Sequence, residues 1–282
     1  LAAKYSEEDA QAVINKTGPM SLWHCRENEN SLTLSIDAIN ALLKQYEIDI
    51  QSISNLVSVT ESPVLGFPGN AAMLASTFPL NKNISIFDLN AGCTGFVDAI
   101  KICASINSNS LIVCSETYSK HIKRFNRATS SLFSDGAAAT YFQPNQWLLV
   151  NSYSLFKRDT FKSISLSSVD SELIMDGKEV FNFVASDVAP ELVKILSDTN
   201  DVSRAYIHQG SKLVVDYLAT RLKRFKIEIP RNIEVAGNFV SATIPLLMHE
   251  DMQKNPISSG ESILLVGFGV GLSMSACILK RK

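Results

Sequence analysis

Residues 84–96 carry the sequence ISIFDLNAGCTGF, and the rest of the chain is organised around this stretch. Its alternating apolar start is typical of a strand, and it ends in a turn of small residues. After the turn, Phe96, Ile100 and Cys103 recur at the spacing of one helix face. Cys93 is therefore expected in the first turn of a helix that follows a strand.

A cysteine at this position has the setting of a nucleophile. Unpaired backbone N–H groups and the positive end of the helix dipole stabilise a thiolate, so we expect the pKa of Cys93 to lie below its ordinary value. Gly92 and Gly95 let the backbone turn sharply and let a substrate approach the sulfur. A buried structural cysteine is the alternative, and this stretch alone does not decide between the two.

The composition is that of an ordinary globular protein. The 282 residues suggest one large domain or two fused ones, with 46% hydrophobic and 19% charged residues. A net charge of -2 argues against nucleic acid as the main partner. No apolar run approaches the roughly 20 residues of a membrane span, and the first residues lack the layout of a signal peptide. We expect a cytoplasmic protein without a membrane partner.

Cysteine and histidine usage supports this expectation. The five cysteines form no CxxC pair, which fits reduced thiols, and the four histidines show no metal-site spacing. No metal or cofactor is expected. Cys103 and Cys114 are interpreted as core residues, Cys25 and Cys277 receive no role, and His121 and His249 are expected in solvent.

Strands and helices alternate along both halves of the chain, which predicts the α/β class. Helices are expected near residues 6–16, 32–43, 71–76, 96–103, 180–188 and 213–222. Strands are expected near residues 53–60, 84–89, 111–114, 137–142, 147–155, 205–208, 233–237, 263–266 and 272–279.

Three polar residues stand at the ends of predicted strands, where open α/β sheets bind ligands: Cys93, His208 and Asn238. A thiol with two hydrogen-bond donors suits acyl transfer, because the thiolate attacks a carbonyl while the donors hold the developing oxyanion. Taken singly, His208 could be a core histidine and Asn238 a turn residue.

Several sequence blocks occur in the order seen in one enzyme family. They are AGCTGF at 91–96, HQ at 208–209, GNFVSATIP at 237–245 and GFGVG at 267–271, with supporting blocks at 17–18, 133–137 and 175–181. In these blocks the chain resembles β-ketoacyl-[acyl-carrier-protein] synthase III from about residue 6 to its end. The last block is not a dinucleotide-binding fingerprint, because only eleven residues follow it.

The resemblance implies a thiolase-like fold, a five-layer αβαβα sandwich of two similar halves, normally in a homodimer. Residues 1–146 would form the half with Cys93, and residues 147–282 the half with His208 and Asn238.

The resemblance also implies a reaction, part of fatty acid biosynthesis. Cys93 would take an acyl group from acyl-CoA or from an acyl carrier protein. His208 and Asn238 would bind a malonyl-type extender for decarboxylative condensation. The backbone N–H of Cys93 and one from Gly269 or Val270 would form the oxyanion hole.

Two surface roles follow from the same resemblance. Phe67 would line the acyl pocket of the partner subunit. The basic run Arg221, Lys223, Arg224 and Lys226 would dock an acidic acyl carrier protein, although a solvated helix end explains these charges as well.

The chain departs from the family at a few positions. The tryptophan that stacks on coenzyme A falls at Ala12, and a neighbouring arginine falls at Lys16, which weakens coenzyme A as the primer carrier and leaves an acyl carrier protein open. After His208 the usual Gln-Ala-Asn becomes Gln-Gly-Ser at 209–211. Residues 115–120, SETYSK, resemble members that accompany surface-polysaccharide or flagellin sugar pathways.

Two alternatives stay open at this point. An acyltransferase could pass the acyl group from Cys93 to a hydroxyl or an amine. A thiolase-fold subunit without activity could pair with an active partner.

Overall fold

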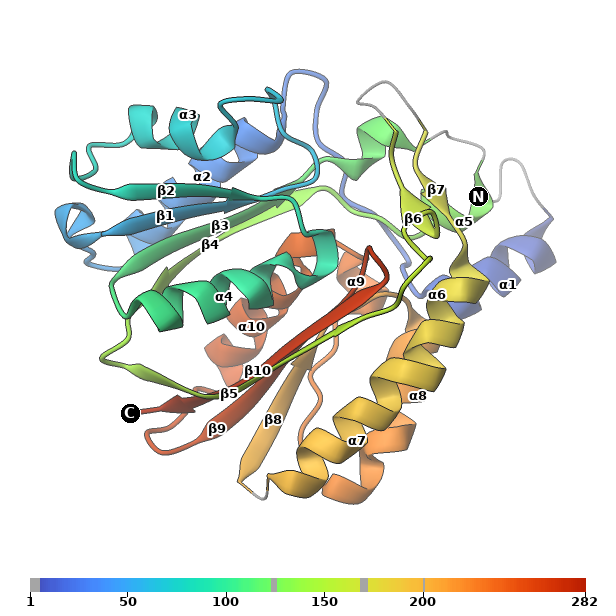
Figure 1. The fold of residues 1–282 in the computed structure, drawn as a ribbon. Coiled ribbons are helices and arrows are strands. Elements are labelled where there is room, and N and C mark those ends of the chain that lie inside the picture. The colour runs from blue at the N-terminus through green and yellow to red at the C-terminus, as the bar shows by residue number, and fades with distance from the viewer. Residues whose placement is uncertain (1–5, 123–125, 168–171, 200) are drawn as a thin grey trace.

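The computed structural model describes residues 6–122, 126–167, 172–199 and 201–282. In these ranges the chain forms two four-stranded sheets and a two-stranded hairpin (Figure 1). The first sheet has the order β2-β1-β3-β4, with β1 Asn55–Val59, β2 Ser85–Leu89, β3 Ser110–Glu116 and β4 Gly136–Phe142. The second has the order β5-β10-β9-β8, with β5 Trp147–Phe156, β8 Val202–Ile207, β9 Ser262–Gly269 and β10 Ser273–Arg281. The hairpin pairs β6 Ile164–Ser165 with β7 Ile174–Met175.

Each sheet mixes parallel and antiparallel pairs. In the first, β1 runs parallel to β2 and β3, and β4 is antiparallel to β3. In the second, β8 and β9 are parallel, and β10 is antiparallel to both β9 and β5. The predicted boundary between residues 146 and 147 falls between strands of different sheets, but the division into two halves stays a prediction.

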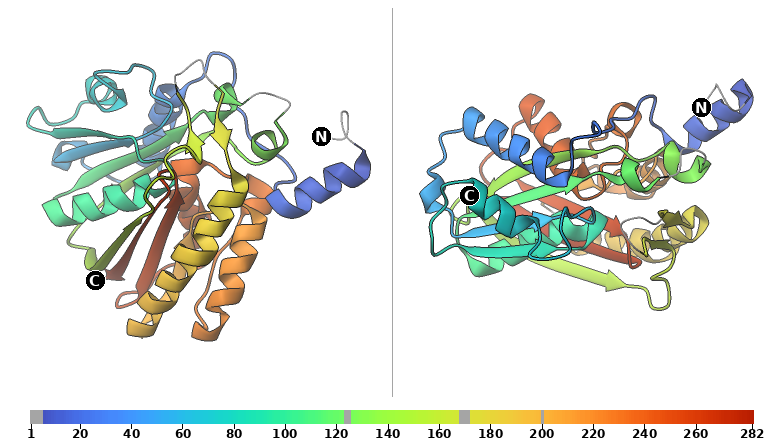
Figure 2. Two further views of the ribbon diagram at one scale, coloured as in Figure 1. Left: turned by 45° about the vertical axis from the view of Figure 1, so that its right-hand side comes forward. Right: turned by 90° about the horizontal axis from the view of Figure 1, so that it is seen from above.

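Helices form three layers around the sheets, so the predicted α/β class is confirmed. On the outer face of the first sheet lie α2 Ser31–Gln45 and α3 Asn70–Thr77. Between the sheets lie α4 Gly95–Ile106 and α10 Thr243–Lys254. Outside the second sheet lie α6 Gly177–Phe183, α7 Ala189–Asp198 and α8 Lys212–Leu222. Shorter helices are α5 Arg127–Ser130 and α9 Ile233–Ala236, while α1 Glu7–Thr17 projects from the body beside α8 (Figure 2).

The first two helices of the chain begin at capping residues. The Ser6 hydroxyl accepts a hydrogen bond from the backbone N–H of Asp9, and Asn30 closes a capping box with Thr33. None of the helices in the described ranges is both long and apolar enough to cross a membrane.

The strand predicted at residues 233–237 is wrong. Residues 233–236 form one helical turn, α9, in which Ile233 is fully buried and Gly237 ends the turn at a φ of 75°. A short apolar run does not distinguish a buried strand from a buried helical turn. Here the left-handed conformation of Gly237 suits a helix end better than a continuing strand.

The second sheet passes directly beneath the turn that carries Cys93. A Cβ added to Gly267 in β9 would lie 2.5 Å from the carbonyl oxygen of Cys93 and 2.8 Å from Cα of Thr94. Both are backbone atoms, which cannot move aside as a flexible side chain does. A glycine at position 267 therefore allows the contact between β9 and this turn.

We expect Gly267→Ala to destabilise the fold, because its methyl group would push β9 away from the Cys93 turn. Overpacking of this kind lowers the free energy of unfolding by about 1–3 kcal/mol, which urea unfolding would measure. Gly177→Ala is the control, because a Cβ there meets nothing within 4 Å. An unchanged urea midpoint for Gly267→Ala would contradict the argument.

Candidate active site

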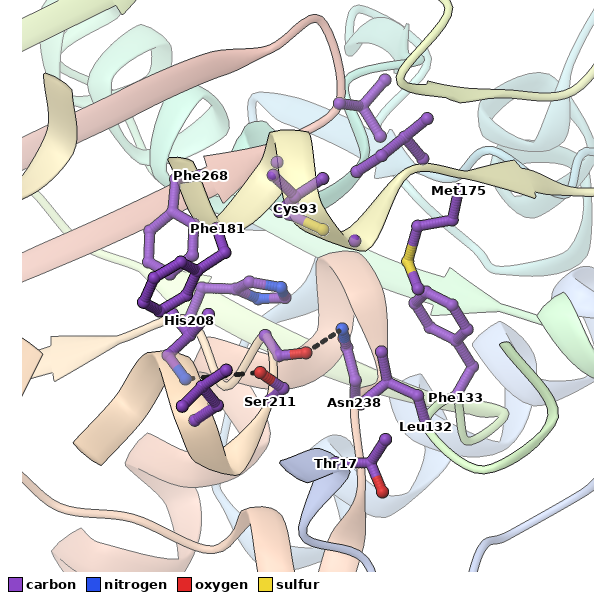
Figure 3. A pocket seen from close by; sticks show the side chains of 18 of the residues that line it. Thr17, Cys93, Leu132, Phe133, Met175, Phe181, His208, Ser211, Asn238 and Phe268 are labelled. Carbon is purple, nitrogen blue, oxygen red and sulfur yellow. Dashed lines mark hydrogen bonds between the residues drawn. The ribbon is translucent and has the colours of Figure 1, made fainter. Parts of the chain in front are cut away.

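The three polar residues singled out by the sequence line one cavity of about 230 Å³ (Figure 3). Cys93, His208 and Asn238 come from three separate segments, and their side chains point toward a common space. Gly269 and Val270 line the same cavity. The remaining wall is largely apolar and includes Leu132, Phe133, Ile164, Met175, Val180, Phe181, Leu213, Val214 and Phe268.

Cys93 lies between a strand and a helix, as predicted. It is the middle residue of a 3-10 turn, Gly92–Thr94, that follows β2 and leads directly into α4. Gly92 has a φ of 48°, and a Cβ there would lie 2.6 Å from Oε2 of Glu61. The turn therefore needs glycine both for its backbone conformation and for the close approach of a carboxyl group.

The predicted low thiol pKa is wrong for this site without substrate. Burial raises the pKa of Cys93 well above its ordinary value, and the nearby carboxyls of Glu61 and Glu116 act in the same direction. Backbone hydrogen bonds from Cys93 and Val270 oppose this shift. The prediction considered only the helix N-terminus, whereas the two carboxyls come from other strands.

His208 directly follows β8 and is held in place by both its backbone and its ring. Its N–H donates to the carbonyl of Val266 in β9 at 2.8 Å, and its ring packs edge-on against Phe268. Burial lowers the pKa of His208 to about 3, so the ring is neutral near pH 7. Its Nδ1 has no hydrogen-bond partner among the described residues. A neutral imidazole can present one N–H donor to the cavity.

Asn238 was expected at the end of a strand, but the structure places it just after the helical turn α9. Its backbone N–H donates to Leu132, and its side-chain Oδ1 accepts hydrogen bonds from the Val240 N–H at 2.8 Å and the Thr243 hydroxyl at 3.3 Å. Because the oxygen is held in this way, Nδ2 turns toward the cavity, where it makes a long 3.4 Å bond to the Gly210 carbonyl. The amide thus has N–H groups available to a ligand.

A buried carboxyl pair beside Cys93 was missed in the sequence. Glu116 ends β3 and accepts hydrogen bonds from the Ser241 hydroxyl at 2.6 Å, the Ser62 hydroxyl at 3.2 Å and the Glu61 N–H. Glu61 follows β1 and accepts a hydrogen bond from the Tyr118 hydroxyl. Both acids stand where adjacent parallel strands end, a position that could have drawn attention to them.

Other predicted residues lie away from this centre. Phe67 is 90% exposed on the loop before α3. The basic run Arg221, Lys223, Arg224 and Lys226 is exposed in the last turn of α8 and just after it, whereas the first turn of that helix lines the cavity. At 1.5 Å per residue, roughly 15 Å of helix separates the basic run from the turn that lines the cavity. Lys16 lines the mouth, and Ala12 is exposed on α1, one helical turn earlier.

Models of protein families match this chain in two places. The model described as 3-oxoacyl-[acyl-carrier-protein (ACP)] synthase III matches residues 87–153, and that of its C-terminal part matches residues 194–281. Together they span more than half of the chain and include Cys93, His208 and Asn238. The chain belongs to the 3-oxoacyl-[acyl-carrier-protein] synthase III family. This family consists of condensing acyltransferases.

Full-length relatives agree with this assignment. The chain is 26% identical to β-ketoacyl-[acyl-carrier-protein] synthase III of Clostridium beijerinckii, over 99% of this chain and 93% of that protein. The synthase III structure from Thermus thermophilus superposes with a TM-score of 0.85 at 25% identity, over 96% and 90% of the two chains. The structure of the priming β-ketosynthase of the R1128 polyketide pathway superposes with a TM-score of 0.87 at 25% identity, over 96% of this chain and 87% of that chain. The thiolase-like fold expected of the family is thereby confirmed.

The buried carboxyl pair predicts how stability changes with pH. Burial, with the neighbouring Glu61, raises the pKa of Glu116 to about 8. Between the ordinary carboxyl pKa and about 8, the unfolded chain loses this proton while the folded protein keeps it. Glu116 therefore lowers the free energy of unfolding as the pH rises through this window.

We expect Glu116→Gln, an uncharged mimic of the protonated acid, to gain stability relative to the parent protein between pH 5 and pH 8. The gain is on the order of 3 kcal/mol and can be measured by urea unfolding at each pH. Glu47→Gln, at an exposed carboxyl, is the control. A stability difference that does not vary with pH would show that Glu116 is ionised throughout.

Proposed function

We propose that this chain condenses an acyl group carried on Cys93 with a malonyl thioester, releasing CO2 and a 3-oxoacyl thioester. The observation that carries the proposal is the convergence of a thiol, a neutral imidazole and an oriented amide in one apolar cavity. Membership of the synthase III family supports the same chemistry.

In the first step the sulfur of Cys93 attacks the carbonyl of an acyl thioester. A new carbon–sulfur bond forms at Cys93, the old one to the carrier breaks, and the thiol proton leaves with the carrier sulfur. Because burial raises the pKa of Cys93, we infer that its proton departs during the attack rather than before it. The N–H groups of Cys93 and Val270, beside the sulfur, would stabilise the developing oxyanion.

In the second step His208 and Asn238 hold the thioester carbonyl of the malonyl group. Loss of CO2 leaves an enolate, whose oxygen accepts hydrogen bonds from Nε2–H of His208 and Nδ2–H of Asn238. A histidine with a pKa of about 3 donates a hydrogen bond without protonating the carbanion, which keeps the carbon nucleophilic. The carbanion then attacks the acyl carbonyl on Cys93 and expels its thiolate.

The carrier of the primer is the next part of the proposal. Lys16 lines the cavity, Ala12 lies one helical turn earlier on α1, and no aromatic ring stands at either position. A lysine there can pair with the phosphate of a pantetheine arm, whereas stacking on an adenine ring lacks its aromatic partner. We therefore favour an acyl carrier protein over coenzyme A as the donor, with malonyl carrier protein as the extender and no further cofactor.

A homodimer belongs to the proposal as well. Exposed apolar side chains follow one side of the first sheet, on the loop before α3 and on the edge strand β2: Val64, Leu65, Phe67, Ile86 and Phe87. An exposed edge strand with apolar residues favours pairing with a second chain. Phe67 would then reach the acyl pocket of the partner, and sedimentation would report twice the mass of 30.9 kDa.

The central experiment separates the two steps. We expect Cys93→Ser to abolish the acyl-enzyme adduct in intact-protein mass spectra. Asn238→Ala should slow decarboxylation of the malonyl thioester on the order of 10²-fold, since one enolate donor is lost, while acylation changes much less. Cys25→Ser, at a cysteine outside the cavity, is the control. An adduct that persists in Cys93→Ser, or acylation without CO2 release on adding malonyl thioester, would refute the proposed function.

Docking of the carrier protein can be tested at the basic run beyond α8. If an acidic carrier binds there, Arg221→Glu with Arg224→Glu should raise KM for carrier-protein substrates about tenfold or more, because attraction becomes repulsion. Small thioester analogues, which need no docking surface, should react at the parent rate. Equal effects on both kinds of substrate would place the docking surface elsewhere.

A further inference from the structure

A second cavity, of about 370 Å³, adjoins the cavity that contains Cys93. The two cavities share Tyr118, Ile164 and Val270 as walls. Val270 also makes a backbone hydrogen bond to the thiol of Cys93, so the sulfur lies close to the shared wall. An acyl group on Cys93 that points away from His208 and Asn238 therefore extends toward the second cavity.

The wall of this cavity combines apolar residues, such as Leu166 and Leu173, with an equal number of polar ones. Glu61 lines it, and the carboxyl of Glu61 packs against the backbone of Gly92, next to the nucleophile. Asn90, Tyr118, His121 and Ser165 line it as well. This contrasts with the first cavity, whose wall is largely apolar. A pocket shaped for a plain alkyl chain would bury no carboxyl group beside the thioester.

Hydrogen-bonding capacity in the cavity exceeds what the protein itself satisfies. Among the described residues, the Tyr118 hydroxyl is the one side chain that donates a hydrogen bond to the carboxyl of Glu61, and the described lining residues include no lysine or arginine. His121 was expected in solvent, yet its Nδ1 is buried and has no partner among the described residues. The carboxyl of Glu61 and Nδ1 of His121 thus keep hydrogen-bonding capacity that the described residues do not use. Burial also raises the pKa of Glu61, as expected for a carboxyl that lacks a cation.

We propose that the acyl group loaded on Cys93 carries a hydrogen-bond donor, a hydroxyl or an ammonium group, which Glu61 binds in the second cavity. This inference rests on the proposed function and names its primer class. A donor near the thioester would reach the carboxyl that packs on Gly92, and His121 could accept a second hydrogen bond deeper in the cavity. A plain alkyl primer would displace water from Glu61 without donating a hydrogen bond to its carboxyl.

The experiment compares three primers of equal length on one carrier: butyryl, 3-hydroxybutyryl and 3-aminobutyryl thioesters. The rate of Cys93 acylation is followed by intact-protein mass spectrometry, and CO2 release is followed after adding malonyl thioester. We expect at least one polar primer to load tenfold or more faster than butyryl. Comparison of the 3-hydroxybutyryl and 3-aminobutyryl thioesters shows whether the site binds a hydroxyl or an ammonium group.

Variants at Glu61 test the assigned contact. Glu61→Ala should abolish the preference for the polar primer. Glu61→Gln keeps a hydrogen-bond acceptor but loses the charge, so it should retain a preference for a hydroxyl and lose one for an ammonium group. Glu61→Leu, of similar size but without an acceptor, should also abolish the preference for either polar primer, which keeps the test decisive should Glu61→Ala not fold. Glu47→Ala, at an exposed carboxyl, should leave the primer preference unchanged.

The outcomes distinguish this inference from the proposed function. If butyryl loads as fast as both polar primers, or if the preference survives in Glu61→Ala or Glu61→Leu, the inference is overturned while CO2 release still supports condensation. If none of the primers acylates Cys93, the proposed function fails and the inference fails with it.

Discussion

The close contact between the backbone of β9 and the turn that carries Cys93 is the constraint on which the site depends. Gly267 has no side chain, so β9 lies against the carbonyl of Cys93, and the strand then continues to Gly269 and Val270. A Cβ on Gly269 would lie only 3.0 Å from the Cys93 sulfur. The thiol and the N–H of Val270 lie close together because β9 of the second sheet packs directly on the turn that follows β2 of the first sheet.

The electrostatics around Cys93 follow from burial more than from the helix. A helix N-terminus stabilises negative charge by about 0.3–1 kcal/mol at exposed sites, whereas removing a thiolate from water beside two carboxyls costs more. The thiol of Cys93 therefore stays protonated. Such a site protects the cysteine from unwanted reaction and makes nucleophilicity depend on a bound substrate, whose carbonyl oxygen can accept the local N–H groups.

The two sides of the cysteine differ in chemistry because different elements supply them. The side toward His208 and Asn238 has neutral donors in an apolar wall, which suits an enolate. The other side has the carboxyl of Glu61, which the loop after β1 brings against Gly92. The condensing chemistry of the family accounts for the donors on the side toward His208 and Asn238. On the second side, Glu61 is the group on which the proposed choice of primer depends.

The sequence by itself determined the alternation of strands and helices, the position of Cys93 before α4, and the three residues that meet in the cavity. These features are local or appear as ordered blocks, so periodicity and motif order reveal them. Only the tertiary structure decided the helical turn at Ile233, the pKa of Cys93 and the second cavity. The pKa of Cys93 and the second cavity depend on groups more than twenty residues apart in sequence, such as Glu61 beside Gly92. Burial and neighbouring charge have no local sequence signature, because they arise only when the strands pack.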